Sequence, residues 1–257
     1  MATHLIAYTA SIDSATPVAL NTVVDDVLTR TGTTRYVVPD EYNNVRFAIA
    51  SGPNLTRAQL RSPSLDARLW FPEVIPHRRG AETLSLTVPE VYVPAAPIAL
   101  VPSEELEAFA AEDATGASQV NVFVALGPAE LPAPPGGDLR VLRFTGSTTL
   151  TARTWTTVTL TPDRSIEPGE YTVVHFLAIS ANAIAARLIL PPQIWRPGLP
   201  ALAGTEAVAR DAYLAPLEAV SFYNMGTFTH VRLPVIQFFS AAADTSEVVY
   251  IWAVRAA

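Results

Sequence analysis

The side chains that most often bind metals are few in this chain and are poorly spaced for that task. None of its four histidines pairs with another in an H-x-H or H-E-x-x-H pattern of the kind that holds zinc; they are His4, His77, His175 and His230. The chain has no cysteine, so thiolate metal sites and disulfides are both excluded. We therefore expect that it binds no metal and no cofactor.

Other catalytic chemistries also lack their residues. There is no G-x-S-x-G nucleophile elbow and no G-x-G-x-x-G after an expected strand. All 17 basic residues are arginine, which excludes a Schiff-base lysine and a Walker-type phosphate loop. Adjacent acids occur at Asp25-Asp26 and Glu104-Glu105, but neighbouring side chains need not converge on one substrate. The sequence predicts that the protein is not an enzyme.

Composition limits the partners. The net charge of −7 argues against a general nucleic-acid-binding surface. No segment approaches the roughly 20 uninterrupted apolar residues of a membrane span, so the chain is expected not to be transmembrane. Only 16% of the residues are charged, which reflects either many alanines or surface buried between subunits. The one basic concentration, suited to a genome, membrane or subunit contact, consists of Arg57, Arg61, Arg68, Arg78 and Arg79.

One motif occurs twice, once in each half of the chain. RYVVPDEYNNVRFAIAS (35–51) and RSIEPGEYTVVHFLAIS (164–180) share seven identities without a gap. The two halves also end alike, in QVNVFVAL (119–126) and EVVYIWAV (247–254). The repeat predicts two similar modules.

The repeated residues have a structural and a functional interpretation. In the first, Pro sets a turn, Glu is placed to pair with Arg, and the aromatic side chains enter the core. In the second, Arg and Glu form a sugar or ligand pocket. A repeated folding corner is the favoured interpretation, and its residues are Arg35, Pro39, Glu41, Tyr42, Phe47, Arg164, Pro168, Glu170, Tyr171 and Phe176.

The elements around the motif are mostly strands. Segments rich in Val, Thr, Ile and aromatic residues predict strands at 3–10, 17–24, 34–38, 45–50, 83–88, 119–126, 139–144, 147–161, 171–179, 184–190, 218–223, 228–239 and 247–254. Two segments, 103–114 with Ser103 as N-cap and 204–215 with Thr205 as N-cap, predict one helix late in each half. The Pro/Gly-rich stretch 128–138 is expected to cross between modules with few backbone hydrogen bonds.

The repeated motif, the closing apolar strands and the helix expected before each together resemble the double jelly-roll major capsid proteins of tailless icosahedral viruses and bacteriophages. The resemblance covers nearly the whole chain. It implies an all-β fold of two tandem antiparallel jelly-roll barrels with one short helix each, at 1–130 and 139–257, joined by a Pro/Gly linker at 131–138. It also implies a structural protein of the virion, assembled in the host cytoplasm. Its partners would be two further copies in a homotrimeric capsomer, neighbouring capsomers and minor capsid proteins.

The alternative function is a carbohydrate-binding or adhesive β-sandwich protein. It depends on exposed aromatic rings for stacking on sugars, and the candidates are Trp70, Trp155, Trp195 and Trp252. Size in solution separates the two functions, because a capsid protein forms a trimer or larger assembly.

Overall fold

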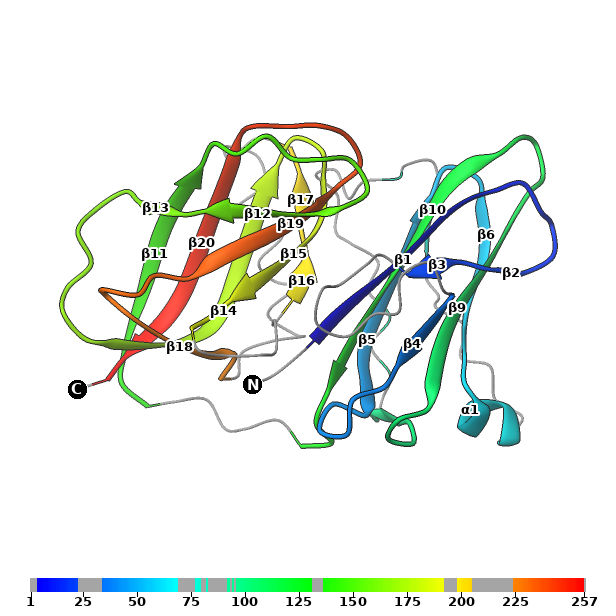
Figure 1. Cartoon of the computed structure of the whole chain (residues 1–257), viewed down its shortest axis with the longest axis horizontal. Helices are drawn as coiled ribbons and strands as arrows, with labels where there is room; N and C mark the ends of the chain where they lie inside the picture. Colours follow the sequence, from blue (N-terminus) through cyan, green and yellow to red (C-terminus); the bar gives the residue numbers. More distant parts are fainter. Residues whose placement is uncertain are drawn as a thin grey trace. The chain divides into compact units, whose positions relative to one another are not determined.

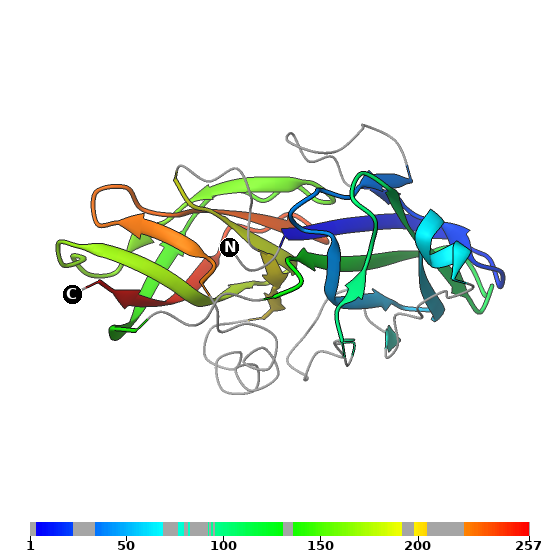
Figure 2. The same cartoon turned by 90° about the horizontal axis from the view of Figure 1, so that it is seen from below.

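The computed structural model describes residues 4–22, 34–68, 77–79, 82, 92, 94, 96–130, 136–191, 198–204 and 224–256. Apart from His4, which is grouped with the second unit, these residues fall into two compact units that divide between Ala129 and Glu130. In Figures 1 and 2 the blue to green strands gather in one unit and the light-green to red strands in the other. Of the predicted linker 131–138, residues 131–135 lie outside the described part of the chain, and Asp138 is the first residue of a strand.

Two sheets make up the described part of the first unit (Figure 1). The larger has the order β3-β1-β10-β5-β7, with β8 also paired to β5, and its strands are β1 (His4–Ile12), β3 (Asn21–Thr22), β5 (Asn44–Gly52), β7 (His77–Arg79), β8 (Ile98–Ala99) and β10 (Ser118–Gly127). In the smaller, β2, β4 and β6 all pair with β9; their bounds are β2 (Val18–Ala19), β4 (Arg35–Val37), β6 (Leu55–Arg61) and β9 (Glu105–Glu112).

The second unit repeats this plan. Its larger sheet has the order β13-β11-β20-β14-β17, with β18 also paired to β14, and contains β11 (Asp138–Gly146), β13 (Thr161–Pro162), β14 (Glu170–Ser180), β17 (Leu202–Ala203), β18 (Gly226–Thr229) and β20 (Glu247–Arg255). Its smaller sheet has the order β12-β19-β15-β16, with β12 (Trp155–Thr159), β15 (Ala183–Ile189), β16 (Gly198–Pro200) and β19 (Val235–Ser240).

Strand order assigns each unit to a jelly roll. In each unit the first long strand lies beside the last, β1 beside β10 and β11 beside β20, and the last lies beside the strand that follows the motif turn, β5 or β14. The strands between them in sequence, β6 with β9 and β15 with β19, pair in the other sheet. Apart from the parallel pairs β5–β7 and β14–β17, the strands are antiparallel, and such crossing between two sheets is the double Greek key of a jelly roll. The all-β prediction of two tandem jelly rolls is confirmed.

The cores explain why these segments are strands. Phe47 and Phe176, at equivalent places on β5 and β14, are both fully buried. Each of these strands also carries a bulge near the motif turn. The bulge of β5 lies opposite Ala125 and Leu126 of β10, and the bulge of β14 lies between Val173 and His175. The bulges bend both strands at the same end, where the motif turn leaves the sheet.

The prediction of one helix in each half is wrong for 103–114. Residues 105–112 form β9, in which Leu106, Ala108 and Ala110 are buried while Glu105 and Glu107 are half-buried on the other face. This period of two fits a strand, and pairing with strands on both edges overrides the helix propensity of Glu and Ala. Ser103, the expected N-cap, instead has a left-handed φ of 65° in the preceding turn. The other predicted helix, 204–215, lies outside the described residues from 205 onward.

One short helix that the sequence did not predict is α1 (Pro63–Ala67). It begins after Ser62, whose hydroxyl accepts a hydrogen bond from the Leu65 N–H at 3.3 Å. Glu104 holds the helix start by accepting from the backbone N–H of Ser64 at 2.9 Å and from its hydroxyl at 2.7 Å. Glu104 therefore has a structural role, because its carboxylate fixes the start of α1. Among the described residues no helix is long and apolar enough to cross a membrane.

Candidate interaction surface

The motif turn of the first unit forms a fixed corner. The Tyr42 N–H donates to the Pro39 carbonyl at 3.2 Å, and Asp40 and Glu41 form the exposed turn between them. Tyr42 is only 4% exposed, and burial, with the nearby Glu41 charge, raises its pKa to about 12. The loop before β9 holds the corner through a Ser103 N–H bond to the Val38 carbonyl at 2.9 Å.

The motif turn of the second unit forms an equivalent corner by different bonds. The Tyr171 hydroxyl donates to the Glu167 carbonyl at 2.9 Å, and its ring stacks on Phe228 of β18 at 5.3 Å between centroids. The loop between β18 and β19 again holds the turn, since the Gly169 N–H donates to His230 Nδ1 at 3.2 Å. In both units, therefore, the motif turn packs on the loop ahead of β9 or β19.

The charged members of the motif do not converge in either unit. Arg35 lies on β4 and pairs with Glu105 at 2.8 Å and Glu107 at 3.5 Å. Among the described residues no ion pair joins an arginine to Glu41 or Glu170, so the expected Arg–Glu pairing within the motif is wrong. Its physical reason is the strand β9, which replaces the predicted helix and places its two glutamates against Arg35. Pro39 and Pro168 each precede a turn, as their fixed φ favours.

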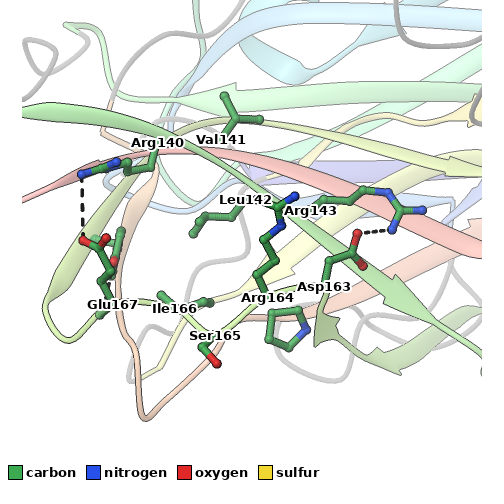
Figure 3. A pocket seen from close by; sticks show the side chains of 11 residues that line it. Arg140, Val141, Leu142, Arg143, Asp163, Arg164, Ser165, Ile166 and Glu167 are labelled. Atoms are coloured by element: carbon green, nitrogen blue, oxygen red, sulfur yellow. Dashed lines mark hydrogen bonds and ion pairs between the residues drawn. The ribbon is translucent and has the colours of Figure 1, made fainter.

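A cavity of about 480 Å³ lies beside the second corner (Figure 3). It is lined by β11, by the loop that follows β13 and by Tyr171 at the start of β14. Leu142 and Ile166 give it apolar walls, while Arg140, Arg143 and Arg164 supply guanidinium groups. The sequence prediction did not include this cavity.

Two ion-paired clusters stand at opposite ends of the cavity (Figure 3). At one end Arg143 pairs with Asp163. At the other, Glu167 accepts from Arg255 at 2.5 Å and lies 3.9 Å from Arg140, which also pairs with Asp138 at 2.6 Å.

Arg164 stands apart from these pairs. It is exposed, and within the described part of the chain no carboxylate or carbonyl accepts from its guanidinium. With the four arginines 140, 143, 164 and 255 and the three carboxylates 138, 163 and 167, the cavity and its rim carry one excess positive charge. The local charge of the cavity is therefore opposite in sign to the net charge of the chain, which is −7.

The predicted basic concentration is dispersed in the fold. Arg57 and Arg61 lie on β6, and the Arg61 guanidinium covers the Phe109 ring at 4.3 Å. Arg68, after α1, donates to the Ala99 carbonyl at 2.7 Å. Arg78 and Arg79 belong to β7, in the larger sheet.

The histidines and tryptophans that the structure describes are mainly packing residues. His4 and His175 are buried, and the His175 ring lies 5.3 Å from that of Trp252. Trp155 is covered by the Arg187 guanidinium at 4.1 Å and contacts Phe239. Among the described residues no three His, Asp or Glu side chains could hold a metal ion. Trp70 and Trp195 lie outside the described residues.

No protein-family model and no curated protein matches the chain. The crystal structure of the STIV MCP aligns with 96% of this chain and 96% of its own at 9% identity and a TM-score of 0.27. That of the major capsid protein P2 from bacteriophage PM2 aligns with 98% and 97% at 7% identity and a TM-score of 0.25. The strand order described above, and not these alignments, assigns the fold. The chain is a double jelly roll.

Proposed function

We propose that this double jelly roll is a major capsid protein, that it forms homotrimeric capsomers, and that these tile an icosahedral shell. The observation that carries the proposal is the tandem repetition of one jelly-roll strand order in a single chain. Three such chains supply six similar units, which is the number that a nearly hexagonal tile needs. The two units would be the domains 1–130 and 139–257, and the protein would reside in the virion.

The physical properties of the chain suit repeated subunit contacts. A shell protein buries surface on several sides, so a charged fraction of 16% is expected of it. Each long central strand has neighbours on both sides within its sheet, which leaves few free edges for uncontrolled pairing. The cavity of the second unit has apolar walls and paired charges, a composition that fits a protein contact as well as a small ligand.

The proposal is tested by mass and shape in solution. Light scattering coupled to size-exclusion chromatography should give three times the chain mass of 27.6 kDa at micromolar protein. Negative-stain images of the same fraction should show a three-fold particle with a nearly hexagonal outline. A stable monomer across the concentration range would contradict the proposal.

A monomer would leave the carbohydrate-binding alternative to be tested on a glycan array. The packing of Trp155 against Arg187 and Phe239 removes one of its candidate stacking rings. A trimer that binds no glycan would reject that alternative.

A further inference from the structure

Two surfaces of the chain are complementary in charge and in apolar character. The cavity beside the second corner offers Arg164, a cation with no ion pair among the described residues, above the apolar side chains Leu142 and Ile166 (Figure 3). The first corner offers two exposed carboxylates, Asp40 and Glu41. We infer that the first corner of one copy docks into the cavity of the second unit of another copy, in an assembly of the kind proposed above.

The first corner has the shape and chemistry of a fixed knob. Within the described part of the chain neither Asp40 nor Glu41 has a cationic partner, and Asp40 accepts only from the Ser103 hydroxyl at 3.3 Å. Val101, in the loop that Ser103 bonds to this corner, is 55% exposed. The Glu104 carboxylate holds that loop by accepting from the Val101 N–H at 2.7 Å. A rigid turn loses little entropy on docking, and an exposed valine gains by leaving water.

The cavity is matched to such a knob. A volume of about 480 Å³ accommodates a few side chains, and a guanidinium over apolar walls favours a carboxylate carried next to an apolar group. The ion pairs at its two ends already satisfy Arg143 and Arg140, which leaves Arg164 to receive the incoming charge. Docking would place Glu41 on Arg164 and Val101 against Leu142 and Ile166.

Contacts of this kind join two different patches. Because the knob lies on the first unit and the cavity on the second, each copy can give one and receive one. Such head-to-tail contacts close into a ring when the rotation between copies allows it. The inference therefore deepens the proposed trimer by naming its contact, and it rests on that proposal.

The absence of cysteine makes a direct test possible. Arg164→Cys and Glu41→Cys are made in separate copies of the chain, one with a mass tag, and are mixed under mild oxidation. A disulfide requires Cα atoms within about 7 Å, so a tagged–untagged heterodimer on a non-reducing gel reports contact between copies. Thr149→Cys is the control. Thr149 lies in an exposed loop of the second unit that Leu150 and Asp244 connect to Ser180, at the end of β14 away from the corner, and it should not cross-link to Glu41→Cys.

Charge reversal gives a second readout. Arg164→Glu should weaken association by about tenfold or more, Glu41→Arg should do the same, and the two changes in one chain should restore it. Thr149→Glu, at the end of β14 away from the corner, should leave association unchanged. A trimer that forms normally with both single reversals and shows no specific cross-link would overturn this contact and leave the proposed function standing. A monomeric wild-type protein would overturn both.

Discussion

The carboxyl group of Glu247 is buried and makes no hydrogen bond of normal geometry within the described part of the chain, which predicts an unusual dependence of stability on pH. Glu247 begins β20 and is 1% exposed. It lies opposite Gly146 of β11, where a Cβ would come within 2.9 Å of the Glu247 carboxylate. Burial, reinforced by the charge of Asp244 and opposed in part by nearby backbone N–H groups, raises the pKa of Glu247 from 4.5 to about 7.

The direction of the effect follows from proton binding. Below pH 4.5 the carboxyl is protonated in the folded and the unfolded chain, and it has no net effect. As the pH rises from 4.5 to about 7, the unfolded chain releases this proton first, so the free energy of unfolding falls. Above pH 7 the loss is complete. The two pKa values correspond to an upper limit of about 3 kcal/mol, which solvent screening reduces to about 2 kcal/mol.

Glu247→Gln removes this charge and keeps the shape of the side chain. Urea unfolding of the variant and wild type, followed by tryptophan fluorescence at fixed protein concentration, should be compared at pH 5 and pH 8. The stability of the variant relative to wild type should be about 2 kcal/mol higher at pH 8 than at pH 5. The free-energy cost of burying the uncharged glutamine amide is the same at both pH values, so it cancels when the two values are subtracted. Glu130→Gln, at an exposed position, is the control and should show no such difference. Equal effects of Glu247→Gln at the two pH values would refute the reasoning.

Three further predictions concern packing in the second unit, each checked by the same urea assay. Phe176→Ala should cost about 3–5 kcal/mol because the ring is fully buried, whereas Val141→Ala, at a side chain 54% exposed, should change stability by less than about 0.5 kcal/mol. Gly146→Ala should destabilise by about 1–3 kcal/mol, since its Cβ would overlap a Val158 methyl, while Gly136→Ala meets nothing within 4 Å and should be neutral. Tyr171→Phe should lower the free energy of unfolding by about 1 kcal/mol, because the hydrogen bond to the Glu167 carbonyl is lost. An unchanged free energy of unfolding would show that this bond does not stabilise the corner.

The sequence repeat predicted much of the strand plan. The shift that places Arg35 on Arg164 also carries β5 onto β14, β6 onto β15, β8 onto β18, β9 onto β19 and β10 onto β20. Most residues of β5, β10, β14 and β15 are buried, so side-chain size and alternation are constrained along them. The first strands of each unit do not keep this spacing, since β11 and β12 both begin several residues later than the same shift of β1 and β2 would place them. The spacing of the repeat is therefore kept from the motif strand onward and is lost at the first strands.

Local propensity failed where tertiary pairing decided the outcome. The stretch that became β9 is rich in Glu and Ala, which are good helix formers, yet its inner face alternates Leu106, Ala108 and Ala110. Alternation with a period of two was present in the sequence and outweighed composition. The predicted strand 228–239 is instead two strands, β18 and β19, separated by a turn that contains Arg232 and Pro234.

The cavity could not be found from local patterns, because distant segments build it. Arg143 meets Asp163 from 20 residues away, and Arg255 meets Glu167 from 88. Sequence inspection instead favoured the clustered arginines of 57–79, which the fold distributes over β6, β7 and the end of α1. Clustering along a chain is a weak guide in a jelly roll, where neighbours in space come from strands that are distant in sequence.

The two corners show what a duplicated fold keeps and what it changes. The buried Tyr and Phe positions are the same in both units of the chain, because each unit must fill a similar core. The exposed charges differ: the first corner presents Asp40 and Glu41, while the rim of the second has one positive charge in excess. A contact of one patch with itself is two-fold symmetric and ends at a pair of subunits. A ring of chains needs patches that differ and complement each other, and divergence of these exposed charges on a common core supplies that difference.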